Sequence, residues 1–228
     1  MILDTYMQIG KQNGGEFRHS FRNLRSEEIA AGTDAQTGTF LVLDQGEKSY
    51  RFSRKIVSVQ KPAFSCRFPI RSRKNKALGY RVLLGDEVVL QSYTEGVSLG
   101  KGWIFSKGFR FSVYLYKDAV YHCFRVGFPD EDCHYYCVTN PQGQTAAIIQ
   151  RHHGSAEGKR TTVYIADPGM QELAMLVCAS ETMIVSFRTD DSGIDDPSSG
   201  PYVSVTDEEK SVFDKNFIPA VKAMDRIL

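Results

Sequence analysis

The sequence lacks an excess of charge of either sign: 28 Lys and Arg residues stand against 27 Asp and Glu residues, for a formal net charge of +1. No global field therefore draws the chain towards nucleic acid or an anionic membrane, and any such attraction must be local. A secretory start is also missing, because Asp4 comes early and no long apolar run follows a basic segment in residues 1–10. The sequence predicts a cytoplasmic protein, for which any membrane association is peripheral.

Cysteine is scarce and odd in number, which favours reduced, buried thiols over a disulfide framework. The five cysteines are Cys66, Cys123, Cys133, Cys137 and Cys178. Long uncharged hydrophobic runs are missing too. The longest apolar stretch, 170–187, is interrupted by Gln171, Glu172 and Glu181, whereas a membrane-spanning helix needs about 20 nearly uncharged residues. We therefore expect no transmembrane segment.

What the sequence has is a composition typical of a globular domain, with 42% hydrophobic and 24% charged residues. From residue 39 onwards, short runs of β-branched and aromatic residues alternate with turn residues, which is typical of antiparallel strands. We predict strands over 39–43, 49–52, 55–60, 63–70, 78–84, 87–92, 110–117, 120–127, 133–138, 144–151 and 160–166. Gly85-Asp86, the segment 117–119 and the segment 140–143 read as tight turns.

Alternation of side chains is clearest between residues 109 and 127, where both faces of the predicted sheet carry bulky groups. Such a sheet is either packed on both sides or closed around something. Asp167 and Pro168 then provide a helix start, and the apolar residues of 173–187 cover the whole circumference of a helix. Because such a helix must be buried all round, the fold expected is mainly β, an antiparallel β-barrel of about twelve strands that encloses this helix.

The expected organisation has four parts. Residues 1–38, rich in Gly, Asn, Arg and Glu around isolated apolar positions, are interpreted as a loosely packed N-terminal arm with one short strand over 17–24. Residues 39–188 form the barrel, with its central helix over 168–187. An acidic linker, 189–205, precedes an amphipathic C-terminal helix over 206–228, which begins with the capping box Thr206 and Glu209 and is bent by Pro219. Docking of this helix on its own barrel is favoured over docking on a protein partner.

Serial hairpins, followed by Tyr164-Ile165-Ala166-Asp167 and the apolar run 173–187, resemble the tubby C-terminal-like superfamily, which includes tubby, the phospholipid scramblases and the plant LURP-one-related proteins. The resemblance covers roughly residues 39–188 and is one of architecture rather than of motif. It implies a barrel around a hydrophobic helix. It also directs attention to basic side chains on the barrel, because tubby holds a phosphoinositide headgroup with such residues.

The densest basic segment lies between two predicted strands and is the candidate lipid-binding site. Its residues are Arg71, Arg73, Lys74 and Lys76, with Arg54 and Lys55 upstream. Each Lys or Arg near an anionic surface contributes about 1 kcal/mol, so four could localise a protein weakly. The plainer interpretation of the same residues is a solvated hairpin loop.

Other clusters carry weaker signals. Cys133 and Cys137 lie about 13 Å apart on one strand, at about 3.3 Å per residue, too far for one tetrahedral metal ion. His152-His153 with Ser155 and Glu157 could imitate a hydrolase site, but no nucleophile elbow accompanies them. The aromatic residues of 103–116 have few basic neighbours, so they indicate barrel wall rather than nucleic-acid stacking.

Together these observations predict a non-enzymatic binding or scaffold module, without metal, cofactor or nucleic acid, recruited to anionic phospholipid headgroups through the residues around Arg71–Lys76. Two alternatives stay open. One is a barrel that binds a small apolar ligand, with a C-terminal helix as its lid. The other, weaker alternative is a hydrolase-like enzyme that uses the loop 152–157.

Overall fold

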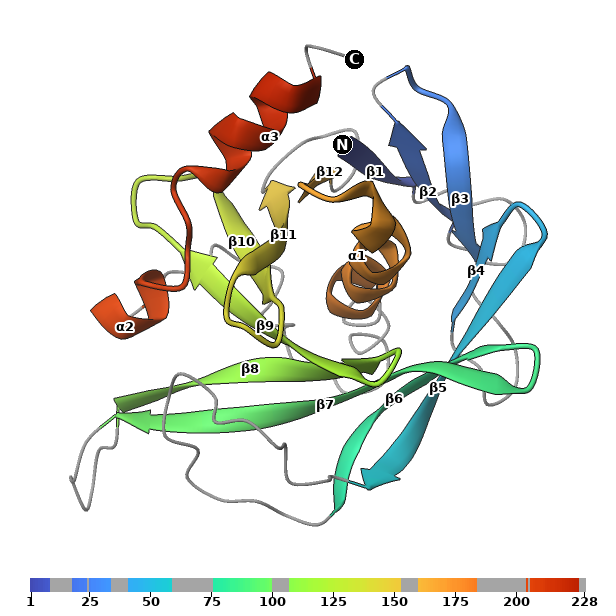
Figure 1. Cartoon of the computed structure of the whole chain (residues 1–228), viewed down its shortest axis with the longest axis horizontal. Helices are drawn as coiled ribbons and strands as arrows, with labels where there is room; N and C mark the ends of the chain where they lie inside the picture. Colours follow the sequence, from blue (N-terminus) through green and yellow to red (C-terminus); the bar gives the residue numbers. More distant parts are fainter. Residues whose placement is uncertain are drawn as a thin grey trace.

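Twelve antiparallel strands form a closed barrel around a central helix, which confirms the expected fold class (Figure 1). The structure is a computed structural model that describes residues 1–8, 18–23, 25–33, 41–58, 76–99, 107–152, 160–183, 204 and 206–225. Each strand pairs with its neighbours in the sequence, and β1 closes the ring on β12. The strands are β1 (Ile2–Gln8), β2 (Arg18–Asn23), β3 (Glu28–Thr33), β4 (Leu41–Gln45), β5 (Lys48–Ser58), β6 (Lys76–Leu84), β7 (Glu87–Leu99), β8 (Lys107–Tyr116), β9 (Ala119–Gly127), β10 (Cys133–Thr139), β11 (Thr145–His152) and β12 (Arg160–Ile165).

The N-terminal segment differs from the expected loose arm, because three of its stretches are barrel strands. β1 pairs with β12 from Ile2 opposite Tyr164 onwards, and β2 occupies the one short strand that was predicted there. Leu3 and Phe21 are buried in the core. Leu3 and Phe21 are therefore inward-facing positions of barrel strands, and the barrel begins well before residue 39.

Two predicted strands, 49–52 and 55–60, are one continuous strand, β5, because Ser53 and Arg54 continue the pairing with β6 without a break. β7 and β8 are also longer than expected, and their ladder runs from Leu90 opposite Tyr116 to Leu99 opposite Lys107. β6 pairs with β7 only up to Gly79 opposite Tyr93. Beyond that pair the β5–β6 and β7–β8 ladders diverge (Figure 1). The strand predicted over 63–70 lies outside the described residues.

The expected alternation and turns are confirmed. On β8, Tyr114 and Tyr116 belong to the cluster inside the barrel, whereas Phe111 and Val113 belong to a second cluster on its outer surface. Gly85 has a φ of +61°, and Lys117 and Asp118 have φ values of +47° and +61°. The primed two-residue turns of hairpins require such positive φ values, and Gly adopts them without a steric penalty.

The central helix lies inside the ring of strands (Figure 1). A short 3-10 turn, η1 (Pro168–Met170), leads into α1 (Gln171–Cys178) and then a π-helical turn, η2 (Ala179–Met183). Asp167 caps the start by accepting a hydrogen bond from the Gly169 N–H at 2.9 Å. Leu173 to Ala179 are all at most 1% exposed. The apolar circumference read from the sequence is thus buried on every side, as expected, and residues 184–187 of the predicted helix lie outside the described residues.

The C-terminal segment forms two helices on the outside of the barrel instead of one bent helix. α2 (Asp207–Lys210) is capped by Thr206, whose hydroxyl accepts from the Glu209 N–H at 3.1 Å, and α3 (Phe217–Asp225) follows after a turn. Pro219 is the third residue of α3, where a helix has no need of its missing N–H, so it does not bend the chain. No helix among the described residues is long and apolar enough to cross a membrane.

Both C-terminal helices pack on their own barrel, which covers part of the predicted apolar stripe and leaves Met224 43% exposed. Val212, Phe217 and Val221 join the outer apolar cluster, and α3 contacts β1, β11 and β12. Ser204 anchors the segment to β9, because its N–H donates to the Gly127 carbonyl and its hydroxyl accepts from the Gly127 N–H. Asp225 forms an ion pair with the Met1 ammonium group at 3.2 Å.

Candidate functional site

The strand register assigns the predicted lipid-binding residues to one end of the barrel. Lys76 begins β6 opposite Ser58, and Arg54 and Lys55 lie four and three residues before Ser58 on β5. We call this the loop end, defined by the pairs Ser58 with Lys76 and Leu99 with Lys107. Arg71, Arg73 and Lys74 lie outside the described residues, as does most of the loop 152–157. The register therefore fixes the strand positions of Arg54, Lys55 and Lys76 but does not make them direct neighbours, because Arg54 and Lys55 lie opposite Tyr80 and Gly79.

Of the connections at the loop end, those between β5 and β6 and between β7 and β8 are basic, whereas the one between β9 and β10, 128–132, carries Asp130, Glu131 and Asp132. Residues 59–76, between β5 and β6, contain six Lys or Arg and no Asp or Glu. Residues 100–107, between β7 and β8, add Lys101 and Lys107, again without an acidic residue. In an antiparallel meander every second connection lies at the same end, so these segments, far apart in sequence, leave the sheet on the same side. The sequence alone did not show that these two basic connections lie at the same end of the barrel.

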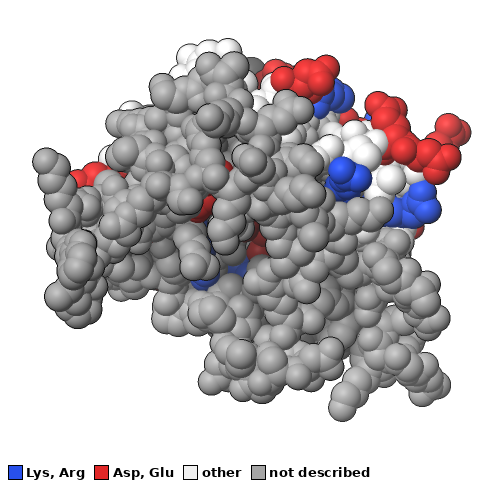
Figure 2. Space-filling model, turned by 90° about the horizontal axis from the view of Figure 1, so that it is seen from below, with Lys and Arg blue, Asp and Glu red and all other residues white. Residues whose placement is uncertain are grey.

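The opposite end, which we call the turn end, is defined by the hairpin turns at 46–47, 85–86 and 117–118. Its charges are mixed: Glu47, Asp86 and Asp118 lie close in sequence to Lys48 and Lys117. Figure 2 shows acidic and basic side chains side by side at the right-hand edge, where Figure 1 places the tips of the β4–β5 and β6–β7 hairpins. This end therefore has no field of one sign among its described residues.

Glu172, in the first turn of α1, is held by four side chains of the barrel wall at the turn end. Lys48 Nζ and Lys117 Nζ lie 3.0 Å and 3.1 Å from its carboxylate oxygens. The hydroxyls of Tyr50 and Tyr116 donate to the same carboxylate. Desolvation raises the pKa of Glu172, but the hydrogen bonds from Tyr116, Tyr50 and the two lysines outweigh it and lower the pKa to about 2. The arrangement fixes the start of the helix to β5, to β8 and to the turn that follows β8.

A second polar cluster lies inside the barrel near the other end of the helix. The Tyr114 hydroxyl donates to the Glu181 carboxylate at 2.7 Å, and desolvation raises the pKa of Glu181. Arg125, His134 and Arg151 lie on inward-facing positions, two residues along their strands from Cys123, Tyr136 and Ile149 of the interior cluster. Arg151 is 2% exposed and His134 is fully buried. Buried charges inside a barrel are costly unless they are paired with opposite charges and hydrogen-bonded.

Sequence reasoning missed this interior cluster, although the signal was present. The alternation placed Arg125 on the same face as Cys123, and Glu181 interrupts the apolar run of the central helix. A charged residue at a position that must face inward is the feature that could have identified the cluster. The periodicity was used to find the apolar face, and the charged exceptions on that face were not followed.

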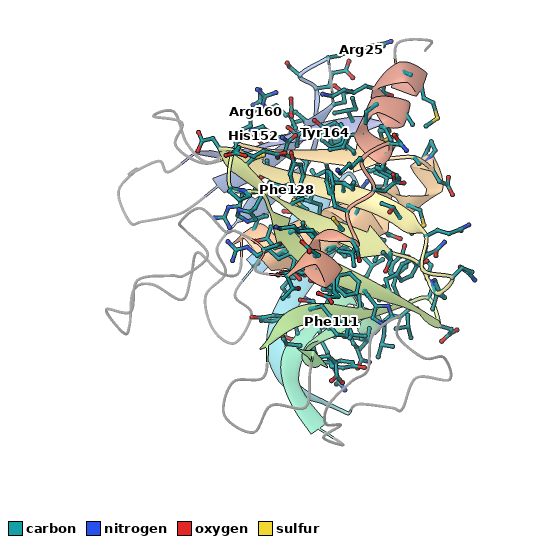
Figure 3. All side chains as sticks on the ribbon, turned by 90° about the vertical axis from the view of Figure 1, so that its left-hand side faces the viewer. Arg25, Phe111, Phe128, His152, Arg160 and Tyr164 are labelled. Carbon is teal, nitrogen blue, oxygen red and sulfur yellow. The ribbon has the colours of Figure 1, made fainter. Side chains whose placement is uncertain are left out.

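A third polar group lies on the outer surface, next to the C-terminal helices. Cys133 Sγ lies 3.3 Å from the Tyr135 hydroxyl and accepts from Gln150 Nε2 at 3.4 Å, and the Tyr164 hydroxyl donates to Gln150 Oε1 at 3.0 Å. His152 is the direct cross-strand neighbour of Cys133, and desolvation with the nearby Arg160 charge lowers its pKa. Figure 3 shows His152, Arg160 and Tyr164 close together on β11 and β12.

Within the part of the chain that the structure describes, no three His, Cys, Asp or Glu side chains lie close enough together to hold a metal ion. Cys133 and Cys137 face the outer cluster, whereas Cys123 and Cys178 are buried inside the barrel. Burial raises the pKa of Cys178 to about 12 and raises that of Cys123 well above its usual range. These interior thiols are therefore uncharged at neutral pH and poor nucleophiles.

The fold and its filled interior define the class of protein: a closed antiparallel β-barrel with a buried central helix and a C-terminal segment packed on its outer wall. No protein-family model, no curated protein and no solved structure matches the chain. The resemblance to the tubby-like superfamily therefore stays a prediction from architecture.

Proposed function

We propose that this protein is a non-enzymatic binding or scaffold module that is recruited to anionic phospholipid headgroups through the loop end of its barrel. The observation that carries the proposal is the strand register, which brings Lys76 and Lys107 to the same end as two connections without acidic residues. At about 1 kcal/mol for each Lys or Arg near an anionic surface, such a cluster is sufficient for reversible recruitment even though the chain is neutral overall.

The packing of α1 favours this proposal over a barrel that binds a small apolar ligand. Leu173, Met175 and Leu176 are at most 1% exposed and contact the inward-facing side chains of the wall. An apolar ligand inside the barrel would have to displace this helix, whose first turn is held by Lys48, Tyr50, Tyr116 and Lys117. Because α1 takes up the middle of the barrel, the outer surface and the connections between strands are the places where a membrane or another large partner binds.

The test is co-sedimentation of the protein with liposomes of graded phosphatidylserine content, at low and physiological salt. Changing Arg71, Arg73, Lys74 and Lys76 to Ala is expected to lower binding at low salt by at least about a hundredfold. The matched control changes four basic residues elsewhere to Ala, namely Arg25, Arg51, Lys210 and Lys215, for the same loss of net charge. Binding that the two variants lose equally, or that salt does not weaken, contradicts recruitment through the loop end.

A further inference from the structure

We propose that the interior of the barrel contains a binding site for an anion of the phosphate class, formed by Arg125, His134 and Arg151 near the C-terminal end of the central helix. This inference goes beyond the proposed surface recruitment and does not depend on it. The site also lies towards the loop end, but its residues come from β9, β10 and β11 and face inward, whereas the basic connections join β5 to β6 and β7 to β8.

The strand register places these side chains next to one another. His134 lies directly opposite Arg151, and Arg151 lies opposite Thr161 on its other side. Arg125 lies opposite Tyr136, and its guanidinium carbon is 6.0 Å from the centre of that ring. His134 contacts the same ring edge-on, with centroids 5.1 Å apart. Two guanidinium groups, an imidazole and two hydroxyls therefore meet on adjoining strands.

Arg151 carries the argument because it is both buried and incompletely bonded. Its side chain is 2% exposed, and its Nη1 has no hydrogen-bond partner among the described residues. A guanidinium group keeps its charge in a protein, so a buried donor nitrogen without an acceptor is destabilising. An anion that accepts from this nitrogen would remove that cost.

The charge balance also calls for an anion. Arg125 and Arg151 contribute two positive charges, and among the described residues the Glu181 carboxylate interacts with the charge of Arg125. Glu181 already accepts from Tyr114, and its pKa is raised by desolvation, which weakens it as a counter-charge. Among the described residues, the two arginines and Glu181 therefore leave an excess of one positive charge, in a medium where charge interactions are strong.

The geometry favours a tetrahedral oxyanion. Guanidinium groups present paired N–H donors that match phosphate oxygens, and they do so better than a lysine ammonium group. Tyr136 and Thr161, which are 3% exposed, can add hydroxyl donors. The phosphate group can belong to a free phosphate or to a lipid headgroup, and the two sources share this chemistry.

The experiment measures thermal unfolding of the full chain in sodium phosphate against sodium chloride of equal ionic strength. With phosphate tenfold above its dissociation constant, the midpoint is expected to rise by about 3 to 6 °C. Arg151→Met, which keeps a long side chain without the charge, is expected to abolish this rise and to unfold at an unchanged or higher midpoint in chloride. Arg160→Met, on the outer face of the neighbouring strand (Figure 3), is the control and should keep the response.

The result that would overturn the site is an equal phosphate response in the wild type and the Arg151→Met variant. A wild type that does not respond, together with a variant that is less stable in chloride, would show a purely structural arginine and would overturn it too. Should the variant not fold, the 31P resonance of inorganic phosphate tests the wild type directly: broadening that excess sulfate reverses supports the site, and an unbroadened line contradicts it.

Binding to liposomes distinguishes a lipid headgroup from free phosphate as the ligand of the interior site. If Arg151→Met weakens binding to phosphatidic acid vesicles, the ligand is a headgroup; if only the response to inorganic phosphate is lost, it is a free phosphate, and both results support the site. The change of Arg71, Arg73, Lys74 and Lys76 to Ala should abolish vesicle recruitment while leaving the phosphate response intact. Failure of the proposed function is therefore distinguishable from failure of the interior site.

Discussion

At the scale of single residues, Glu172 has the clearest role. One carboxylate accepts from two lysines and two tyrosines of β5, β8 and the turn after β8, and thereby fixes the first turn of the central helix to the wall. The side chain of Glu172 is 17% exposed, whereas those of Lys48 and Lys117 are 53% and 70% exposed. The two tyrosine bonds are therefore expected to contribute more than the two ion pairs, which water and salt screen.

We predict that Glu172→Gln lowers the free energy of unfolding by about 2 to 3 kcal/mol at pH 7. The pKa of Glu172 is lowered from 4.5 in the reference state to about 2 in the folded protein. A lowered folded-state pKa means that the contribution is complete above about pH 4.5 and is lost as the pH falls towards 2. The difference between wild type and variant should therefore shrink on going from pH 7 to pH 3.

The measurement is urea unfolding of both proteins at several pH values. The control is Glu47→Gln in the exposed β4–β5 turn, which removes the same charge from the same end and should change stability by less than about 0.5 kcal/mol. A stability difference for Glu172→Gln that stays constant between pH 7 and pH 3 would show that the carboxylate charge is not what holds the helix.

At the scale of elements, the C-terminal helices are attached through a small apolar contact. Phe217 is 8% exposed and Val221 is fully buried in the outer cluster. Phe213 packs against Tyr135 and Phe128, with ring centroids 4.5 Å and 5.3 Å apart. The view of the barrel from its side shows both helices crossing this wall (Figure 3).

We predict that Phe217→Ala destabilises the docked segment by about 3 kcal/mol, because it removes a buried aromatic side chain and leaves a cavity. Limited proteolysis should then cut within 206–225 before the barrel is degraded, since the barrel core does not include these helices. Met224→Ala, at a position that is 43% exposed, is the matched control. Equal proteolysis rates for the two variants would contradict docking through Phe217.

The elements also indicate how far sequence reasoning reaches. Alternation identified β8 and β9 and their two faces, and turn chemistry placed the hairpin at Gly85, because these are local signals. β1 was missed because its partner β12 lies far along the chain, as Ile2 opposite Tyr164 shows. β3 pairs with its neighbours β2 and β4, but its short run contains two Ala and one Gly, which are weak strand formers. Of the candidate site, charge density located the basic connection, but only the strand register brought Lys107 to the same end.

At the scale of the whole molecule, the sequence predicted a barrel but did not reveal that its N-terminal strand closes it. The first strand pairs with the last over five residue pairs, from Ile2 with Tyr164 to Tyr6 with Arg160. A closed barrel has no free edge, so the N-terminal strand is part of the cooperative unit rather than an attachment to it. Such long-range closure is also expected to make folding slow relative to helical proteins of this size.

Hydrogen exchange distinguishes a first strand that closes the barrel from a loosely packed N-terminal arm. The backbone amides of β1 that bond to β12 should exchange only through global unfolding, with protection within about tenfold of that in β8 and β9. An arm would exchange many orders of magnitude faster. Amides of α3, which packs on the outside, serve as an internal reference because that helix can detach while the barrel stays closed. The comparison uses native-state exchange followed by mass spectrometry of peptides from 1–8, 107–127 and 217–225. Early labelling of residues 2–6 would rule out a barrel closed by its first strand.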